Sequence, residues 1–225
     1  MSADRSQWAM QLVARVEKVD PPEVADICAA AAQAVTALIS DERAVDGGEW
    51  SEALTAWQEE GRIRKLVRRA RGANWKRAQE PAGATRVVGS AAVRAYVPCP
   101  MDQIPAPLTK LQIQSSPLPP APPTSEVLEP TGHTTMLIAL TPDPPMSWGK
   151  QGAQSAHAAQ VLWRSTEVAI RETWVGAGSP VTVLHPDAEL WERLCSESPA
   201  GSIEIRDGGF TEVAPGTHTA VAWWR

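Results

Sequence analysis

Apolar and polar residues alternate along the chain in a rhythm that predicts strands separated by helices. Short runs of apolar or β-branched residues predict strands, and longer alanine-rich or amphipathic stretches predict helices. Over the first 97 residues we expect a strand at 10–16, helices at 24–39 and 50–58, and a hairpin of strands 86–88 and 93–97 around Gly89-Ser90.

From residue 134 to the C-terminus the same rhythm returns. We expect strands at 135–140, 180–184, 202–206 and 217–224, and helices at 150–164 and 187–196. Strands separated by helices indicate an α/β fold, with a mixed β-sheet flanked by helices in this C-terminal region.

Proline is concentrated between these two regions, from Pro98 to Pro130, and excludes a regular helix there. Such a segment is extended and semi-rigid. Within it, residues 110–114 are a candidate edge strand that could dock on either region. We therefore predict an α/β domain at 1–97, a Pro-rich linker at 98–133 and a second α/β domain at 134–225.

The two α/β regions match each other weakly. Trp8-Ala9-Met10 and its strand match Thr135-Met136 and its strand, and Trp75 falls where Trp191 falls. The alanine-rich helix at 24–39 matches residues 151–162. Two interpretations stay open: a duplicated domain whose first copy has degenerated, or an α/β rhythm that unrelated units share.

Composition is that of a globular protein with one large or two smaller domains. The three cysteines, Cys28, Cys99 and Cys195, are far apart and lack the spacing of a zinc site, so we interpret them as reduced thiols. No secretory signal opens the chain, and no apolar run approaches the ~20 residues of a membrane helix. We expect a cytoplasmic protein without a membrane partner.

A local basic stretch contrasts with the net charge of −5, which does not suggest a general nucleic-acid binder. Residues 62–77 contain eight Lys or Arg residues and no acidic one. Its apolar positions fit one face of a helix, whereas the match between the two halves makes part of it a strand. Concentrated positive charge suits nucleic-acid phosphates. The alternative is a solvated face neutralised by nearby glutamates. The candidate tRNA-binding residues in this stretch are Arg62, Arg64, Lys65, Arg68, Arg69 and Arg71.

A polar motif at residues 146–158 begins the predicted helix of the second half. Lys150, Gln154 and His157 are spaced i, i+4, i+7 and share one helix face. Ser147 stands at the N-cap position. A helix N-terminus attracts anions, and Lys150 adds a cation to it. A solvated lysine on an ordinary helix explains the same pattern.

A second polar motif spans residues 205–217. Asp207 follows a predicted strand, Gly208-Gly209 form a turn, and Thr211 comes next. This arrangement puts a carboxylate and a hydroxyl at the end of a sheet, where α/β folds often hold their sites. The alternative is a simple connection between strands, because Asp and Gly favour turns for backbone reasons.

In this order and at this separation, the two motifs resemble the type 2 peptidyl-tRNA hydrolases. The family pattern is a Gly-Lys-Gly-Lys run, then Ala-Gln and His-Ala, and much later Asp-x-Gly-x-Thr-x-x-x-Pro-Gly-Thr. The matching residues are Gly149-Lys150, Ala153-Gln154, His157-Ala158, Asp207, Gly208 or Gly209, Thr211, Pro215-Gly216-Thr217 and Thr219. The resemblance covers roughly residues 134–225.

The resemblance implies hydrolysis of the ester between a peptide and the terminal ribose of tRNA, without a cofactor or metal. It places the active site at Lys150, Gln154, Asp207 and Thr211. We expect Asp207 and Thr211 to position or activate water, and Lys150 and Gln154 to stabilise the oxyanion or hold the tRNA end. His157 is interpreted as structural. Members of the family usually pair as homodimers, so a degenerate first half is a candidate for the partner surface within one chain.

The chain departs from the family pattern at two positions. Trp148 stands where the family has its first lysine, and Ser147 replaces a glycine. Trp148 is a candidate either for stacking on the terminal adenine or for anchoring the core. The lost cation keeps two alternatives to peptidyl-tRNA hydrolysis open: a tRNA-binding protein without turnover, and an enzyme that processes a different acyl group on tRNA.

Overall fold

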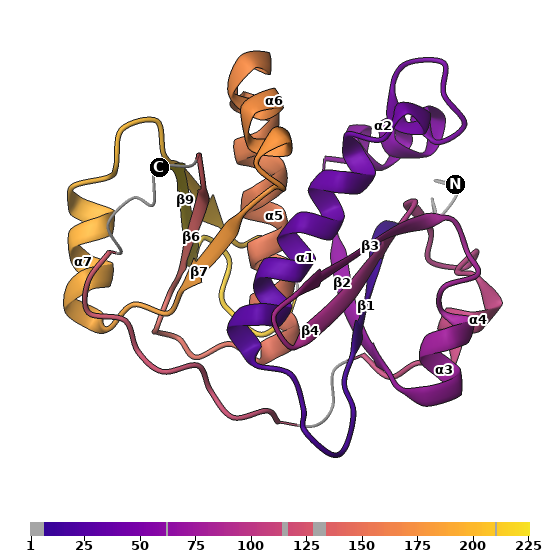
Figure 1. The fold of residues 1–225 in the computed structure, drawn as a ribbon, viewed down its shortest axis with the longest axis horizontal. Helices are drawn as coiled ribbons and strands as arrows, with labels where there is room; N and C mark the ends of the chain where they lie inside the picture. The colour runs from indigo at the N-terminus through magenta and orange to yellow at the C-terminus, as the bar shows by residue number, and fades with distance from the viewer. Residues whose placement is uncertain (1–6, 62, 114–116, 128–133, 210) are drawn as a thin grey trace, which may run out of the picture.

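The computed structural model describes residues 7–61, 63–113, 117–127, 134–209 and 211–225. Two halves carry the same order of principal elements (Figure 1). The first half contains β1 (Trp8–Arg15), α1 (Val24–Ile39), a short 3-10 helix (Glu42–Ala44), α2 (Ser51–Glu59), β2 (Lys65–Ala70), α3 (Gly72–Arg77), β3 (Gly83–Val88) and β4 (Ala91–Tyr96). The second half contains β6 (Met136–Leu140), α5 (Trp148–Ser165), α6 (Val168–Gly176), β7 (Val181–Leu184), α7 (Ala188–Ser196), β8 (Ile203–Arg206) and β9 (His218–Trp224).

The two mixed sheets have matching strand orders, which confirms the predicted α/β fold class. The first sheet runs β2-β1-β4-β3 and the second β7-β6-β9-β8. In each, the first pair is parallel and the other two pairs are antiparallel. The central strands β1 and β6 are almost continuously apolar because both of their faces are covered.

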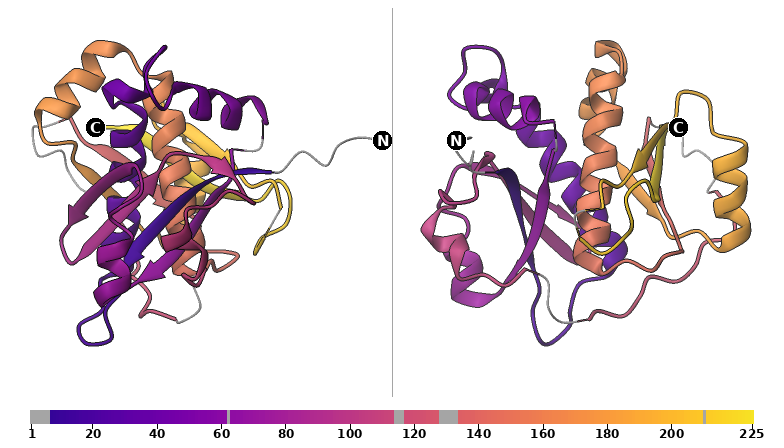
Figure 2. Two further views of the ribbon diagram at one scale, coloured as in Figure 1. Left: turned by 90° about the vertical axis from the view of Figure 1, so that its right-hand side faces the viewer. Right: turned by 180° about the vertical axis from the view of Figure 1, so that it is seen from behind.

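Helices α1 and α5 lie together between the two sheets (Figures 1 and 2). One apolar cluster fills this central layer and includes residues of both halves. Smaller clusters cover the outer faces: α4 (Ala106–Thr109) packs with residues around α3 on the first sheet, and α7 packs on the second. The alanines of α1 make this arrangement possible, because small side chains let a helix approach neighbours on several sides.

Equivalent hydrogen bonds recur in the two halves. The seventh residue of α2, Trp57, donates its indole N–H to the carbonyl of Arg64, immediately before β2. The seventh residue of α6, Trp174, does the same to Pro180, immediately before β7. The same two carbonyls accept from the backbone of the central strands β1 and β6. The halves are therefore structural repeats, and two of the ten tryptophans serve this repeated contact.

The contact between α1 and α5 is reciprocal. Gly152, the fifth residue of α5, faces Ala31, the eighth residue of α1. Conversely, Ser155, the eighth residue of α5, donates to the carbonyl of Cys28, the fifth of α1 (3.0 Å). A surface in which position i meets j while j meets i is the signature of a twofold interface. The two halves thus meet as the subunits of a symmetric dimer do.

The predicted elements agree with most of this fold, with boundaries shifted by a few residues. Three α-helices were not predicted: α6, α3 as a separate element, and α4, a single turn inside the proline-rich segment where a regular helix was excluded. The helical interpretation of the basic stretch is wrong, because Lys65–Ala70 forms a strand paired with β1. Alternate positions of that strand point to opposite sides, so its basic residues do not share one face.

The proline-rich segment passes from the first sheet to the second (Figure 1). It contributes the short strand β5 (Cys99–Pro100) beside β1, and the single-turn helix α4. The expected edge strand at 110–114 is reduced to a bridge between Ile113 and Arg68; residue 114 lies outside the described residues. Thr124 then bridges to Pro186 in the second half. None of the helices in the described ranges is long and apolar enough to cross a membrane.

Candidate active site

The N-terminus of α5 is fixed by a serine cap and a glutamate from a distant loop. The Ser147 hydroxyl accepts from the backbone N–H of Lys150 (3.2 Å) and donates to the carboxylate of Glu212 (2.6 Å). Glu212 also accepts from the backbone N–H of Ser147 (2.8 Å). A carboxylate suits this end of a helix because the helix dipole is positive there. The loop after β8 is thereby tied to the helix that carries Lys150.

Asp207 begins the loop between β8 and β9, and the loop backbone holds it in place. Its N–H donates to the carbonyl of Thr217, and its own carbonyl accepts from Gly216. Its Oδ1 accepts from the N–H of Gly209 (2.8 Å). Gly209 has φ +76° and lies against Pro215, where no Cβ would fit, so this turn requires glycine.

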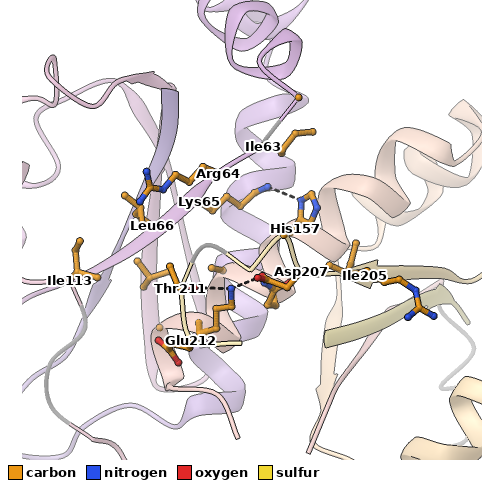
Figure 3. Close-up of a pocket in the computed structure, with 18 residues that line it drawn as sticks. Ile63, Arg64, Lys65, Leu66, Ile113, His157, Ile205, Asp207, Thr211 and Glu212 are labelled. Carbon is orange, nitrogen blue, oxygen red and sulfur yellow. Dashed lines mark hydrogen bonds and ion pairs between the residues drawn. The ribbon is translucent and has the colours of Figure 1, made fainter. Parts of the chain in front are cut away.

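Two side chains of α5 donate to Asp207, and one of them also reaches Thr211 in the loop (Figure 3). Asp207 Oδ2 accepts from Lys150 Nζ (2.5 Å) and Gln154 Nε2 (2.5 Å), which lie one turn apart on α5. Lys150 Nζ also donates to the Thr211 hydroxyl (2.9 Å). The Lys150 and Asp207 side chains are only 9% and 8% exposed, so water screens this ion pair weakly.

Thr219 orients Gln154 from behind. Its hydroxyl, on β9, donates to Gln154 Oε1 (2.8 Å). This contact fixes which end of the amide points at Asp207, because the oxygen is already engaged. Thr219 and Glu212 were not predicted as site residues. Thr219 is part of the motif match, but only the β9 register shows that its side chain reaches Gln154.

The converging residues line a cleft of about 490 Å³ between the two halves. The second half supplies one wall, with Lys150, Gln154, Asp207 and Thr211. The first half supplies the opposite wall, made by the start of β2 and the residues before it, together with Ile113. The four predicted catalytic residues are thus brought together, in a cleft that the second half alone does not form.

Lys65 reaches into this cleft from the first half and contacts α5. Its Nζ donates to Gln160 Oε1 (2.5 Å) and lies 3.3 Å from His157 Nδ1. Burial lowers the pKa of Lys65 well below its ordinary value. Burial, followed by the charges of Lys65 and Lys150, lowers the pKa of His157 to about 3. His157 is therefore a neutral imidazole at physiological pH, as expected of a packed histidine.

The predicted tRNA-binding residues are distributed differently from the catalytic ones. Trp148 is 4% exposed and belongs to the central core, so its packing corresponds to the core-anchor interpretation and leaves no ring face for stacking. Arg68 is 7% exposed and donates to Gln11 and to the carbonyl of Leu111. Arg64 lines the cleft. Arg62 lies outside the described residues.

Arg69 and Arg71 line a second, smaller cavity of about 210 Å³ at the far end of β2. Lys110, Gln112 and Asn74 complete its polar lining, and none of the described lining residues is acidic. Within the described ranges, no group of three or more His, Cys, Asp or Glu side chains is arranged to hold a metal ion.

Comparison with known proteins shows similarity to a peptidyl-tRNA hydrolase over part of the chain. No family model matches the chain. The bovine (Bos taurus) protein named "Peptidyl-tRNA hydrolase 2, mitochondrial" is 30% identical over 106 residues, which are 43% of this chain and 58% of the relative. The chain thus matches less than two thirds of that relative's length. The relative's name places it in mitochondria, and the cytoplasmic location of this protein stays a prediction.

Proposed function

We propose that this protein hydrolyses the ester that joins a peptide, or an N-blocked amino acid, to the terminal ribose of tRNA. The observation that carries the proposal is the convergence of Lys150, Gln154 and Thr211 around Asp207 in a cleft. The similarity to a peptidyl-tRNA hydrolase supports the choice of substrate.

In the proposed reaction, Asp207 and Thr211 hold a water molecule against the ester carbonyl. The water oxygen bonds to the carbonyl carbon while its proton passes to the Asp207 carboxylate. The bond to the ribose oxygen then breaks, and that oxygen takes the proton. The products are a peptide with a free carboxylic acid and a tRNA with a free terminal hydroxyl. Lys150 and Gln154 would stabilise the negative charge on the carbonyl oxygen, in a site where water screens little.

The second cavity supports a proposed contact with the tRNA backbone. Arg69, Arg71 and Lys110 place three cations on one side of β2, and the cleft opens at the other end of the same strand. If the end of an RNA stem entered the cleft, the phosphates of that stem would pass near these three cations. Replacing all three with glutamine should weaken tRNA binding and make log Kd less dependent on log salt concentration. An unchanged salt dependence would exclude this contact.

The test of the function is release of the acyl group from N-acetyl-aminoacyl-tRNA by the purified protein. Wild type should release it, and Lys150→Ala and Asp207→Ala should each abolish most of the release while tRNA still binds. If wild type retains tRNA in a gel shift but releases nothing, the protein is a tRNA-binding protein without turnover. Release of some other acyl group, but not of N-acetylated ones, would indicate the repurposed enzyme.

A further inference from the structure

A cysteine and a histidine meet on the outer face of the second sheet, which α7 covers. Cys195 lies in the last turn of α7, and its Sγ is 3.4 Å from Nδ1 of His218, the first residue of β9. Helix α7 lies across the sheet from α5, so this pair is separate from the cleft (Figure 1). Cys195 is half-buried and the residues that follow it, Ser196 and Glu197, are exposed, so a small reagent can reach its sulfur.

An irregularity in the sheet puts His218 on this face. Residues 220–223 alternate between the central layer and the α7 face. Continued alternation would turn Thr219 toward α7 and His218 toward the central layer. A register shift between β8 and β9 reverses both, so that Thr219 reaches Gln154 and His218 reaches Cys195. The same irregularity therefore supplies one side chain to each face of the sheet.

Glu204 gives the two ring nitrogens of His218 different roles. Its carboxylate lies 3.9 Å from Nε2, the nitrogen that Cys195 does not contact. Nε2 is buried and has no hydrogen-bond partner among the described residues, so a proton there faces the carboxylate, whereas a lone pair there would be repelled by it. The carboxylate therefore favours the tautomer that leaves Nδ1 free to accept from the thiol. A nucleophile, a base and a group that orients the base are thus in line.

Both partners are uncharged at physiological pH. Partial burial, followed by the charge of Glu204, raises the pKa of the Cys195 thiol. Burial lowers the pKa of the His218 imidazole. The thiol therefore becomes a good nucleophile only by passing its proton to the imidazole as it attacks. Glu204 and the Trp191 ring, whose centre is 5.0 Å from that of the imidazole, would stabilise the imidazolium that forms.

We propose that Cys195 is a site of covalent modification by low-molecular-weight disulfides, with His218 as its general base. The inference does not depend on the proposed hydrolysis. The thiol proton passes to Nδ1 while the Cys195 sulfur bonds to one sulfur of the disulfide. The S–S bond of the reagent breaks, and its leaving thiolate takes the proton from the imidazolium. Cys195 is thereby oxidised to a mixed disulfide, and the leaving half of the reagent is reduced to a thiol.

The chain holds no second thiol in a position to displace the attached group. Cys28 is buried in the central core, and Cys99 lies beside β1 in the first half. The mixed disulfide should therefore persist until an external thiol removes it.

Cys99 provides a matched control for the reactivity of Cys195. It is also half-buried, and burial also raises its pKa, but no imidazole contacts it in the described part of the chain. The folded protein is incubated with oxidised glutathione at neutral pH, and mass spectrometry of peptides quantifies the mixed disulfide at each cysteine. We expect Cys195 to react at least about tenfold faster than Cys99. In the urea-unfolded protein the two rates should become similar.

A variant tests the role of the imidazole. His218→Gln should lower the rate at Cys195 about tenfold or more at neutral pH. This deficit should shrink as the pH rises to about 10, because the thiolate then forms without a base. A merely structural effect of the substitution would not depend on pH in this way. His185→Gln, which changes a histidine that contacts Gln151, should leave the rate at Cys195 unchanged.

Two results would overturn the proposal. The first is an equal rate at Cys195 and Cys99 in the folded wild type, a comparison that needs no variant and so holds even if His218→Gln does not fold. The second is an unchanged rate in His218→Gln, or a deficit that is the same at every pH. Neither measurement involves tRNA, so failure of this proposal and failure of the proposed hydrolysis are distinct.

Discussion

The corner at the N-terminus of α5 and the corresponding corner at α1 have the same scaffold and opposite chemistry. The third residue of α5 is Lys150, whereas the third residue of α1 is Asp26. Asp26 accepts from both the N–H and the hydroxyl of Ser90, in the turn between β3 and β4 (2.7 and 2.8 Å). In the first half the carboxylate therefore lies on the helix and the hydroxyl in the turn, whereas in the second half the carboxylate of Asp207 lies in the loop.

The length of the connecting loop explains why only one corner forms a cleft. In the second half, residues 207–217 join the last two strands; in the first half, Gly89 and Ser90 do so alone. Gly89 has φ +49°, and a Cβ there would overlap the Asp26 carboxylate, so the turn lies directly on the helix. The scaffold that the two halves share therefore supports a cleft in one half and a closed hydrogen-bonded contact in the other.

Replacing the carboxylate of each corner with an amide should give the largest difference in kcat between two matched variants. Asp207→Asn is expected to lower kcat for N-acetyl-aminoacyl-tRNA by ~10²–10⁴, because it removes the proposed base. The matched variant Asp26→Asn should keep kcat within about twofold, since a change remote from the reacting atoms does not alter the barrier. Steady-state kinetics on both variants decide the matter. Equal losses in the two would mean that the first corner is also part of the site.

The reciprocal contact between α1 and α5 can be disrupted by a substitution in α5 alone. A Cβ on Gly152 would meet Ile27, Ala31 and Val67 at ordinary contact distances of 3.8–4.0 Å, whereas a leucine has no room. Gly152→Leu should reduce the free energy of unfolding by ~1–3 kcal/mol through overpacking. Gly152→Ala, as its control, should raise it by up to ~1 kcal/mol because alanine favours the helix. Urea denaturation measures both, and a tolerated leucine would contradict the tight packing.

Acid should destabilise the second half through His157. Its pKa is about 3 in the folded protein, and ~6.5 is the ordinary value that the unfolded chain regains. Between these values only the unfolded chain takes up the proton, so stability is complete above ~6.5 and falls as pH decreases. From pH 7 to 5 the loss from this group is about 2 kcal/mol.

Replacing His157 with glutamine gives it the residue that α1 carries at the equivalent tenth position, Gln33. Urea denaturation at pH 7 and pH 5 should show a smaller loss of stability in His157→Gln than in wild type. Parallel behaviour of the two proteins would show that the folded protein protonates this imidazole as easily as the unfolded chain does.

The hydrogen bonds of the Ser90 hydroxyl, in the first corner, should contribute least to the stability of the protein. Ser90→Ala removes the hydroxyl that donates to Asp26 and accepts from the N–H of Glu23 (3.0 Å). The expected loss is ~0.5–1.5 kcal/mol of unfolding free energy, which is small for two hydrogen bonds because both are exposed to water, with no change in kcat. Thermal unfolding beside the kinetic assay checks both. A change in kcat would reveal communication between the two corners.

Local sequence patterns predicted the regular elements well where burial is continuous. The alanine-rich run of α1 and the apolar run of β6 were both located closely. Helix α6 was missed because its apolar positions do not follow a buried face: Val168, Ile170 and Val175 are all exposed. The basic stretch was ambiguous because its apolar residues satisfy both periods, and only pairing with β1 selects the strand.

The wall of the cleft that carries the proposed catalytic residues could be predicted from the sequence, and the opposite wall could not. Helical spacing places Lys150 and Gln154 on one helix face. The family resemblance of the two motifs, in their order along the chain, predicts that Asp207 lies in the same site. Lys65 joins the same cleft only because α5 packs on β2, a contact between distant segments that no local pattern encodes. Likewise, the basic stretch does not reveal that Arg68 points into the protein and Arg69 toward the second cavity.

The covalent connection between the two halves determines how the cleft behaves on dilution. A cleft shared by two separate chains dissociates as their concentration falls. Here the two walls belong to one polypeptide, so their association is intramolecular and does not depend on protein concentration. Molar activity should therefore not decline at nanomolar protein. A single chain also lets the two walls diverge, because a substitution appears once rather than twice, so the two sides of the cleft can acquire different side chains.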